Sequence, residues 1–184
     1  TGSDSADYSD KTVAITVTLT ESVDTVVTIG GIAEDTIRNI ENLIGGTGND
    51  ILTGDSADNL LRGGAGADTL DGALGSDTAD YSDTIQAVSV TLNGSTDTLV
   101  TVGEVAEDTI RNIENLIGGS GNDTLIGDAM ANNLSGGEGN DTLQGGTGND
   151  TIIGGFDDDT VLFSGNLTEY SISYNFTNAA YTVT

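Results

Sequence analysis

Two repeats, one nested inside the other, constrain the fold of this chain more than any other feature of its sequence. The long period is 73 residues, because GSDSADYSD at 2–10 recurs as GSDTADYSD at 75–83. The stretch AEDTIRNIENLIGG at 33–46 recurs unchanged at 106–119. The short period is nine residues, and units of this length follow one another in two blocks. Fixed periods of this kind are typical of solenoids and arrays, in which each unit packs mainly on its neighbours.

Each nine-residue unit divides into a six-residue turn and a three-residue strand. The units occupy 45–80 and 118–162, with glycine frequent at positions one, two and four and Asp or Asn at position six. Glycine permits the backbone angles of a tight turn and lets carbonyl oxygens converge. Position eight is apolar and points inward from a short strand, at Leu52, Leu61, Leu70, Leu125, Leu134, Leu143 and Ile152. We therefore expect an all-β fold, a right-handed parallel β-roll or β-solenoid in which two units complete one coil.

The acidic composition indicates that cations are part of this fold. The chain has 30 acidic and four basic residues, for a formal charge of −26, and it contains 27 glycines but no proline, histidine, cysteine or tryptophan. Self-repulsion on this scale opposes a compact state. Charge and low aromatic content alone are equally compatible with a disordered acidic polymer. The regular order of the repeats favours a folded chain that binds counter-cations.

The same composition disfavours several classes of function. Four scattered basic residues, Lys11, Arg38, Arg62 and Arg111, cannot form the basic patch that nucleic acids or anionic membranes require. No apolar run approaches the length of a membrane span. Paired carboxylates can serve glycoside hydrolysis, but these aspartates follow the nine-residue period without histidine and with few aromatic residues. We therefore expect no enzymatic activity, no nucleic-acid binding and no membrane insertion.

The nine-residue pattern carries a family resemblance. G-G-x-G-x-D-x-U-x, with U an apolar residue, resembles the nonapeptide of the RTX family, which is a calcium-binding repeat. Ca²⁺ accepts six to eight oxygen ligands, including backbone carbonyls, whereas Mg²⁺ demands stricter geometry and transition metals prefer imidazole or thiolate. The resemblance therefore implies several bound Ca²⁺ ions. Asn59 and Asn132 depart from the pattern at position six, so we expect their turns to bind calcium weakly or not at all.

The resemblance also implies a ligand set. In RTX rolls the lower of two stacked turns supplies the carbonyls of positions two and four, the upper supplies those of positions one and three, and each position-six Asp adds its carboxylate. The sites implied are Gly46, Gly48 and Asp50 with Gly63, Ala65 and Asp68; Gly119, Gly121 and Asp123 with Gly136, Glu138 and Asp141; and Gly137, Gly139 and Asp141 with Gly154, Phe156 and Asp159. Further expected ligands at equivalent positions are Gly64, Gly66, Asp77, Gly146, Gly148 and Asp150. We expect two unequal ion columns, the weaker on the edge that contains the two Asn turns.

The connecting segments are expected to be strand-rich extensions of the same stack. Ile15, Val17 and Leu19, like Val88, Val90 and Leu92 in the second copy, alternate with Thr and Ser as in half-buried strands. The run IENLIGG resembles the lead-in to the roll of serralysin-type proteases. That resemblance implies calcium binding by Glu41 with the carbonyl of Asn39, and by Glu114 with that of Asn112; solvated surface Glu residues are the alternative. Asp35 and Asp108 are either turn caps or ligands.

The long period predicts a modular organisation. We expect one module at 1–74 (connecting strands 2–44, nonapeptides 45–74), a second at 75–147 (connecting strands 75–117, nonapeptides 118–147) and a truncated third at 148–184. The sequence starts without Met and inside a repeat, which indicates a segment of a longer protein.

The resemblance implies a secreted bacterial protein that folds outside the cell on binding Ca²⁺. Repetition of nearly identical modules predicts a structural or adhesive role, as a stalk, surface layer or fibre, at the cell surface or in the extracellular medium. The expected partners besides calcium are neighbouring modules of the same chain or of identical chains. The alternative is a calcium-dependent C-terminal folding and secretion module of an RTX enzyme or toxin, such as a protease, lipase or cytolysin.

Overall fold

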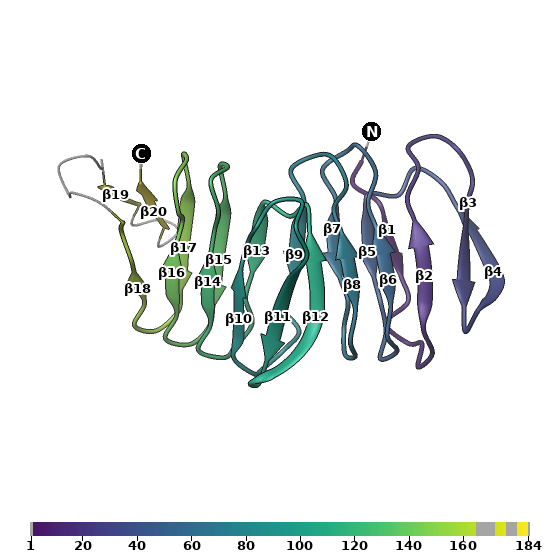
Figure 1. The fold of residues 1–184 in the computed structure, drawn as a ribbon, viewed down its shortest axis with the longest axis horizontal. Helices are drawn as coiled ribbons and strands as arrows, with labels where there is room; N and C mark the ends of the chain where they lie inside the picture. The colour runs from purple at the N-terminus through teal and green to yellow at the C-terminus, as the bar shows by residue number, and fades with distance from the viewer. Residues whose placement is uncertain (1, 165–171, 176–179, 184) are drawn as a thin grey trace.

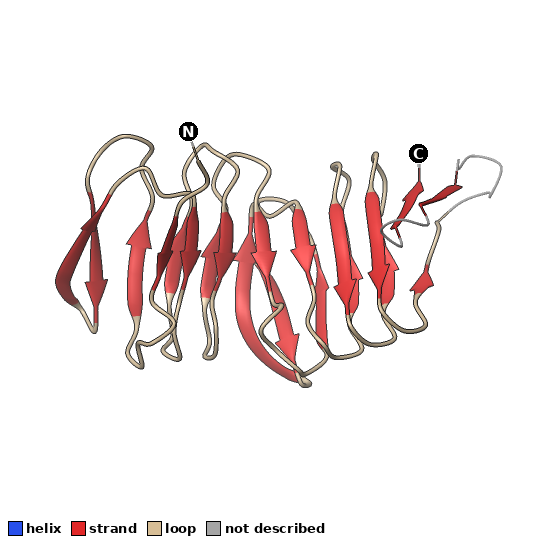
Figure 2. Cartoon of the chain, turned by 180° about the vertical axis from the view of Figure 1, so that it is seen from behind, coloured by secondary structure: helices blue, strands red, loops and turns tan. Residues whose placement is uncertain are grey.

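The computed structural model describes residues 2–164, 172–175 and 180–183, and this part of the chain contains strands and turns but no helix. Short strands stand side by side along the long axis of the molecule, joined by turns along its two edges (Figure 1). The view from behind shows the same row of strands (Figure 2). The described part is therefore a stack of strands along one axis, and each level of this stack is called a rung below.

The strands form two sheets. The nine-stranded sheet runs in the order β1 (Ser5–Asp7), β5 (Asn42–Ile44), β7 (Leu60–Arg62), β9 (Thr78–Asp80), β13 (Asn115–Ile117), β15 (Asn133–Gly137), β17 (Thr151–Gly155), β20 (Ala180–Val183) and β19 (Ile172–Asn175). The eleven-stranded sheet runs in the order β18 (Thr160–Val161), β16 (Thr142–Gln144), β14 (Thr124–Ile126), β10 (Val88–Thr91), β11 (Thr98–Val102), β12 (Val105–Arg111), β8 (Thr69–Asp71), β6 (Ile51–Thr53), β2 (Ile15–Thr18), β3 (Thr25–Ile29) and β4 (Ile32–Ile37).

Within each nonapeptide block, consecutive strands alternate between the two sheets. Strands two units apart pair in parallel, with Leu52 opposite Leu70 in one sheet and Leu43 opposite Leu61 in the other. This register confirms the parallel β-roll in which two nonapeptides complete one coil. The inward leucines of both sheets meet in a single core, and Leu43, Leu52, Leu61, Leu70, Leu125, Leu134, Leu143 and Ile152 are all at most 2% exposed.

The connecting segments join the roll through antiparallel hairpins. Strands β2, β3 and β4 form one antiparallel meander, and β10, β11 and β12 form its counterpart in the second copy. Strands β2 and β10 each pair in parallel with the nonapeptide block that follows them, as expected from their alternating sequence. The antiparallel pairing of β3 and β4, and of β11 and β12 in the second copy, was not expected from the repeat. Strand β12 pairs in parallel with β8, which belongs to the preceding block.

Candidate metal centres

The position-six aspartates of the first block stack along one edge of the roll. The backbone N–H of Asp50 donates to Oδ1 of Asp68 at 2.7 Å, and Oδ1 of Asp50 in turn accepts the N–H of Ile15 at 2.8 Å. The N–H of Asp68 donates to Oδ1 of Asp108 at 2.8 Å. Each carboxylate therefore lies over the turn below it. Asp108, whose role the sequence left open, takes the place of a further position-six Asp.

The second block repeats this arrangement. The N–H groups of Val88, Asp123 and Asp141 donate to Oδ1 of Asp123, Asp141 and Asp159 at 2.7, 2.8 and 3.0 Å. The predicted stack of Asp123, Asp141 and Asp159 is thus present, on turns that are 18 residues apart.

Backbone carbonyls point into the space between stacked turns. A Cβ added to Gly64 would overlap the carbonyl oxygen of Gly46, and one added to Gly45 would overlap that of Gly63 in the turn above. The lower carbonyl thus points up and the upper carbonyl points down. The N–H of Ala65 uses one lone pair of the Gly46 oxygen, at 3.0 Å, and leaves the other for a cation. The same geometry recurs for Gly48 beneath Gly66, Gly119 beneath Gly137 and Glu138, Gly121 beneath Gly139, Gly137 beneath Gly155 and Phe156, and for the downward carbonyls of Gly136 and Gly154.

Three buried carboxylate oxygens have no hydrogen-bond partner in the described part of the chain: Oδ2 of Asp68, Asp77 and Asp141. Burial raises the pKa of Asp68 and Asp77 to about 7 and that of Asp141 to about 6. Leaving such an oxygen unpaired is costly. A cation between the turns would remove this cost, so these residues fit a bound metal.

The first aspartate of each block differs from the second. Oδ2 of Asp50 accepts the N–H of Gly46, and Oδ2 of Asp123 accepts that of Gly119, both at 2.8 Å. In the next turn on the same edge, the corresponding glycine has a positive φ, and the second oxygen of the Asp has no such bond. The unpaired oxygens of Asp68 and Asp141 therefore belong to the middle turns on this edge, whereas that of Asp77 lies on the other edge.

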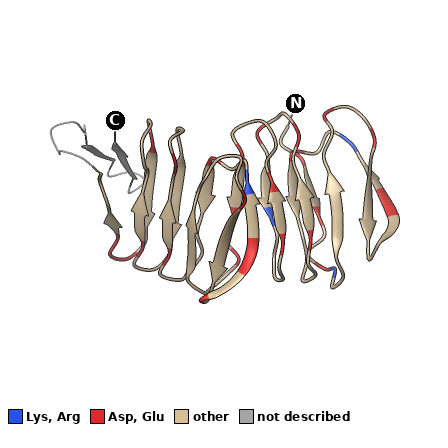
Figure 3. Ribbon diagram, viewed as in Figure 1, with Lys and Arg blue, Asp and Glu red and all other residues tan. Residues whose placement is uncertain are grey.

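The chemistry of the donor set favours calcium. Among the described residues, no three acidic, histidine or cysteine side chains gather closely enough to hold a metal ion. A cation between these turns must therefore take backbone carbonyls together with one or two carboxylates, which Ca²⁺ accepts readily. Figure 3 shows acidic residues in red at turns along the length of the roll.

The two Asn turns lie on the opposite edge, and their side chains are satisfied within the protein. Nδ2 of Asn59 donates to the carbonyl of Glu41 at 3.0 Å, and its Oδ1 accepts the N–H of Asp55 at 2.8 Å. Asn132 makes the equivalent bonds to Glu114 and Asp128. The stacked carboxylates above are Asp77 and Asp150, and Gly146 and Gly148 stack over the carbonyls of Asp128 and Met130. The Asn side chains are thus satisfied by hydrogen bonds within the protein, and weak or absent calcium binding at their turns stays a prediction.

Glu114 and Asn112 lie above the turn that ends at Asp77. Oε2 of Glu114 accepts the N–H of Asp77 at 2.9 Å, and the carbonyl of Asn112 points at Gly72 in that turn. In the first copy, Oε2 of Glu41 accepts the N–H of Asp4 at 2.9 Å, and the φ of Asn39, 52°, is close to the 51° of Asn112. Glu114 and Asn112, the ligands implied by the serralysin resemblance, therefore lie next to Asp77, whose Oδ2 has no hydrogen-bond partner. Calcium binding by these residues stays a prediction.

A comparison with protein-family models identifies the repeats. The model described as "RTX calcium-binding nonapeptide repeat (4 copies)" matches residues 44–79, 112–129 and 126–161. The chain carries RTX calcium-binding repeats. None of the curated proteins compared with the sequence matches it. The RTX repeats are a structural module that binds Ca²⁺, and the described residues include no helix that is long and apolar enough to span a membrane.

The raised pKa values predict how the calcium-free RTX chain responds to acid. An Asp has a pKa near 4 in an unfolded chain, whereas Asp68 and Asp77 titrate at about 7 in the fold. Protonation below about pH 4 therefore stabilises the fold, and this contribution is lost as the pH rises through about 7. In the presence of a chelator, we expect the strand signal in circular dichroism to be stronger at about pH 5 than at about pH 8.

A matched variant separates these sites from the general charge of the chain. Asp68→Asn removes a buried carboxylate from a middle turn, whereas Asp10→Asn removes one that is 75% exposed and pairs with Lys11. The first variant is expected to flatten the pH dependence and the second to leave it unchanged. The same pH dependence of the strand signal in both variants would show that it does not originate in the buried carboxylates of the turns.

Proposed function

We propose that this chain is a calcium-triggered structural module of a secreted bacterial protein, in which Ca²⁺ turns a self-repelling chain into a stiff roll outside the cell. The observation that carries the proposal is the set of unpaired buried oxygens on Asp68, Asp77 and Asp141, facing turns whose carbonyls converge. Asp68 and Asp141 occupy equivalent turns on one edge, and Asp77 lies on the other edge. A cation at each of these oxygens completes the fold.

The bound ions lie between stacked turns. In the first block one ion is held by Gly46, Gly48 and Asp50 from below and by Gly63, Ala65 and Asp68 from above. In the second block the matching sets share Asp141, so this residue serves two neighbouring sites. A further site is formed at Asp77 by Asn112 and Glu114. The hydrogen-bonded amides of Asn59 and Asn132 make their edge the weaker of two columns.

Calcium binding and folding are one event in this chain. At a formal charge of −26 the carboxylates repel one another, and the core that opposes this repulsion is a narrow layer of mostly aliphatic side chains between the two sheets. Because the stacked turns exist only in the folded state, the free energy of ion binding becomes free energy of folding. The chain is therefore disordered at the low calcium of a cytosol, which suits export through type I secretion, and folds in the medium.

The mechanical consequence is a structural or adhesive role. A stack of rungs with ions between them is stiff, so its long axis resists bending. The modules at 1–74 and 75–147 are the repeating units of this rod, and the start of the third, at 148–164, continues it; most of the residues beyond lie outside the described part. Many such modules in succession would form a stalk, surface layer or fibre, and this is the role proposed for the protein.

Direct calcium binding tests the proposal. Isothermal titration of the full chain is expected to show several ions, and Asp141→Asn is expected to lose binding at both sites that share this carboxylate. Asp10→Asn changes the charge equally at an exposed side chain and is expected to bind the full number of ions. Calcium binding by Asp141→Asn indistinguishable from that by the unmodified chain would overturn this placement of the ions.

A further inference from the structure

The same fourteen residues occur in two different environments in this structure. The sequence at 33–46 is repeated at 106–119. In the second copy, β12 lies between β11 and β8, whereas in the first copy β4 is the outermost strand of its sheet (Figure 1). Asp108 is 2% exposed, but its equivalent Asp35 is exposed. An identical segment is thus covered in one place and open in the other.

The covered copy shows what the segment binds. The N–H of Thr109 donates to the carbonyl of Asp68 at 2.8 Å, and the N–H of Gly72 donates to that of Arg111 at 3.1 Å. Oδ1 of Asp108 accepts the N–H of Asp68. The partner of β12 is therefore the end of the preceding nonapeptide block, the turn and strand at 63–72.

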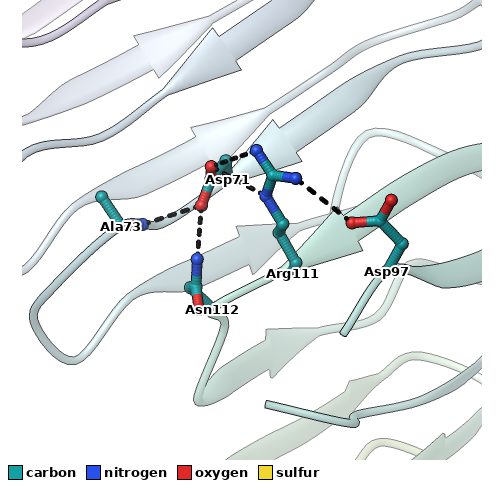
Figure 4. Close-up of polar contacts among 5 residues, drawn as sticks. All are labelled: Asp71, Ala73, Asp97, Arg111 and Asn112. Atoms are coloured by element: carbon teal, nitrogen blue, oxygen red, sulfur yellow. Dashed lines mark hydrogen bonds and ion pairs between the residues drawn. The ribbon is translucent and has the colours of Figure 1, made fainter. Parts of the chain in front are cut away.

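Side chains reinforce this junction (Figure 4). Arg111 contacts Oδ2 of Asp71 through Nη2 at 2.7 Å and through Nε at 2.8 Å, and Nδ2 of Asn112 donates to the other oxygen at 2.7 Å. Burial of Asp71 raises its pKa, but the hydrogen bonds from Arg111 and Asn112 outweigh this, and the pKa is lowered. Arg111 also contacts Asp97 of its own module at 3.4 Å. Asp71 is thus held as an anion by the following module.

The other sheet carries a second ion pair across the junction, in which the block end supplies the arginine and the following module supplies the aspartate. Arg62, at the end of β7, pairs with Asp80 at the end of β9, and its Nη2 donates to Oγ of Ser82 at 2.9 Å. The block end therefore presents one carboxylate and one guanidinium, and the following module presents one of each in reverse. This arrangement specifies both the orientation and the register of docking.

The first module presents the same groups on an open face. Asp35, Arg38 and Asn39 correspond to Asp108, Arg111 and Asn112, and all three are exposed. Arg38 contacts Asp24 at 3.3 Å, which is the counterpart of the contact between Arg111 and Asp97. Asp7 corresponds to Asp80 but is exposed at the end of β1, the outer strand of the other sheet. Open strand edges of this kind are ready to pair with another chain.

We infer that the face formed by β1 and β4 is a docking site for the end of a nonapeptide block from a second copy of the module at 2–74. Strand β8 of that copy pairs along β4, with its Asp71 on Arg38 and Asn39, and strand β7 pairs along β1, with its Arg62 on Asp7. The C-terminal end of this chain is a poor occupant, because β20 already pairs with β17 there. The inference rests on the proposed function, since the docking end is a calcium-bound block.

An extended chain tests this docking. One further copy of residues 2–74 is placed directly before Gly2 of the full chain, which keeps the 73-residue period. In calcium, hydrogen exchange of the Thr36 amide, the equivalent of Thr109, is expected to slow by roughly tenfold or more relative to the original chain. Arg38→Ala is expected to leave the original chain unchanged and to restore fast exchange at Thr36 in the extended chain. The Thr109 amide serves as the internal reference in both.

The outcomes separate docking from calcium-driven folding. Fast exchange at Thr36 in both chains, with the β8 amides of every copy protected, would overturn the docking inference and leave the proposed function standing. Unprotected β8 amides in calcium in both chains would overturn the proposed function, and the docking inference with it.

Discussion

A chelator is expected to remove most of the strand signal of this chain at neutral pH. The fold places the carboxylates of Asp50, Asp68 and Asp108 one above another, and the oxygen that remains on Asp68 is buried without a partner. Near pH 7 these groups are partly or fully ionised, so their mutual repulsion opposes folding without a counter-ion. Far-UV circular dichroism before and after addition of a chelator measures the effect.

Two controls make the chelation result specific. Restoring Ca²⁺ is expected to return the strand signal, whereas the same concentration of Mg²⁺ is expected to fail, because Mg²⁺ demands a regular octahedral shell and retains its water. A strand signal that survives the chelator at neutral pH would show that the roll is stable on its core and hydrogen bonds alone.

Gly137→Ala is expected to destabilise the second block by on the order of 3 kcal/mol and to abolish calcium binding on both sides of its turn. Gly137 has a φ of 114°, and a Cβ added there would overlap the backbone carbonyl of Gly119. Backbone strain and this overlap act together, because the carbonyl cannot move aside without leaving the candidate site. Calcium titration and urea unfolding in saturating calcium measure the two effects.

Gly94→Ala is the matched control for this substitution. Gly94 also has a positive φ, of 55°, but the nearest atom to an added Cβ is Oδ2 of Asp128 at 3.7 Å, which is ordinary contact. The same change is therefore expected to cost about 1 kcal/mol through backbone conformation alone, with calcium binding unchanged. Similar losses for both variants would contradict the role assigned to the stacked turns.

The nonapeptides could be predicted from the sequence because their information is local. Glycine, aspartate and leucine at fixed positions define the turn, its side-chain cap and the inward strand residue, and a period of nine leaves one way to stack them. Asn59 and Asn132 are 73 residues apart, so the long repeat places them at equivalent turns on a single edge. The hydrogen bonds that satisfy these two amides could not be read from it, since they depend on which carbonyl lies opposite.

The connecting segments could be predicted only in part. Alternation around Ile15 and Val88 indicated strands, and both strands join the stack. Alternation gives no pairing partner, so the antiparallel meanders and the contact of β12 with the preceding block were not foreseen. Asp108 remained ambiguous for this reason: its contact with Asp68 spans 40 residues. Asp71 and Arg62 stand at outward positions of their strands, where a charged side chain ordinarily indicates nothing but solvent.

The paired charges between successive modules give the rod a polarity. Arg62 and Asp71 lie on one side of the junction, and Asp80 and Arg111 lie on the other, so the two surfaces that meet are different. Such a heterologous interface cannot close on itself by a two-fold axis, and its repetition along a stack of rungs leads to an open line of subunits. One end of any array built this way always exposes acceptor strands and the other always exposes a block end, so growth and capping are distinct events at distinct ends.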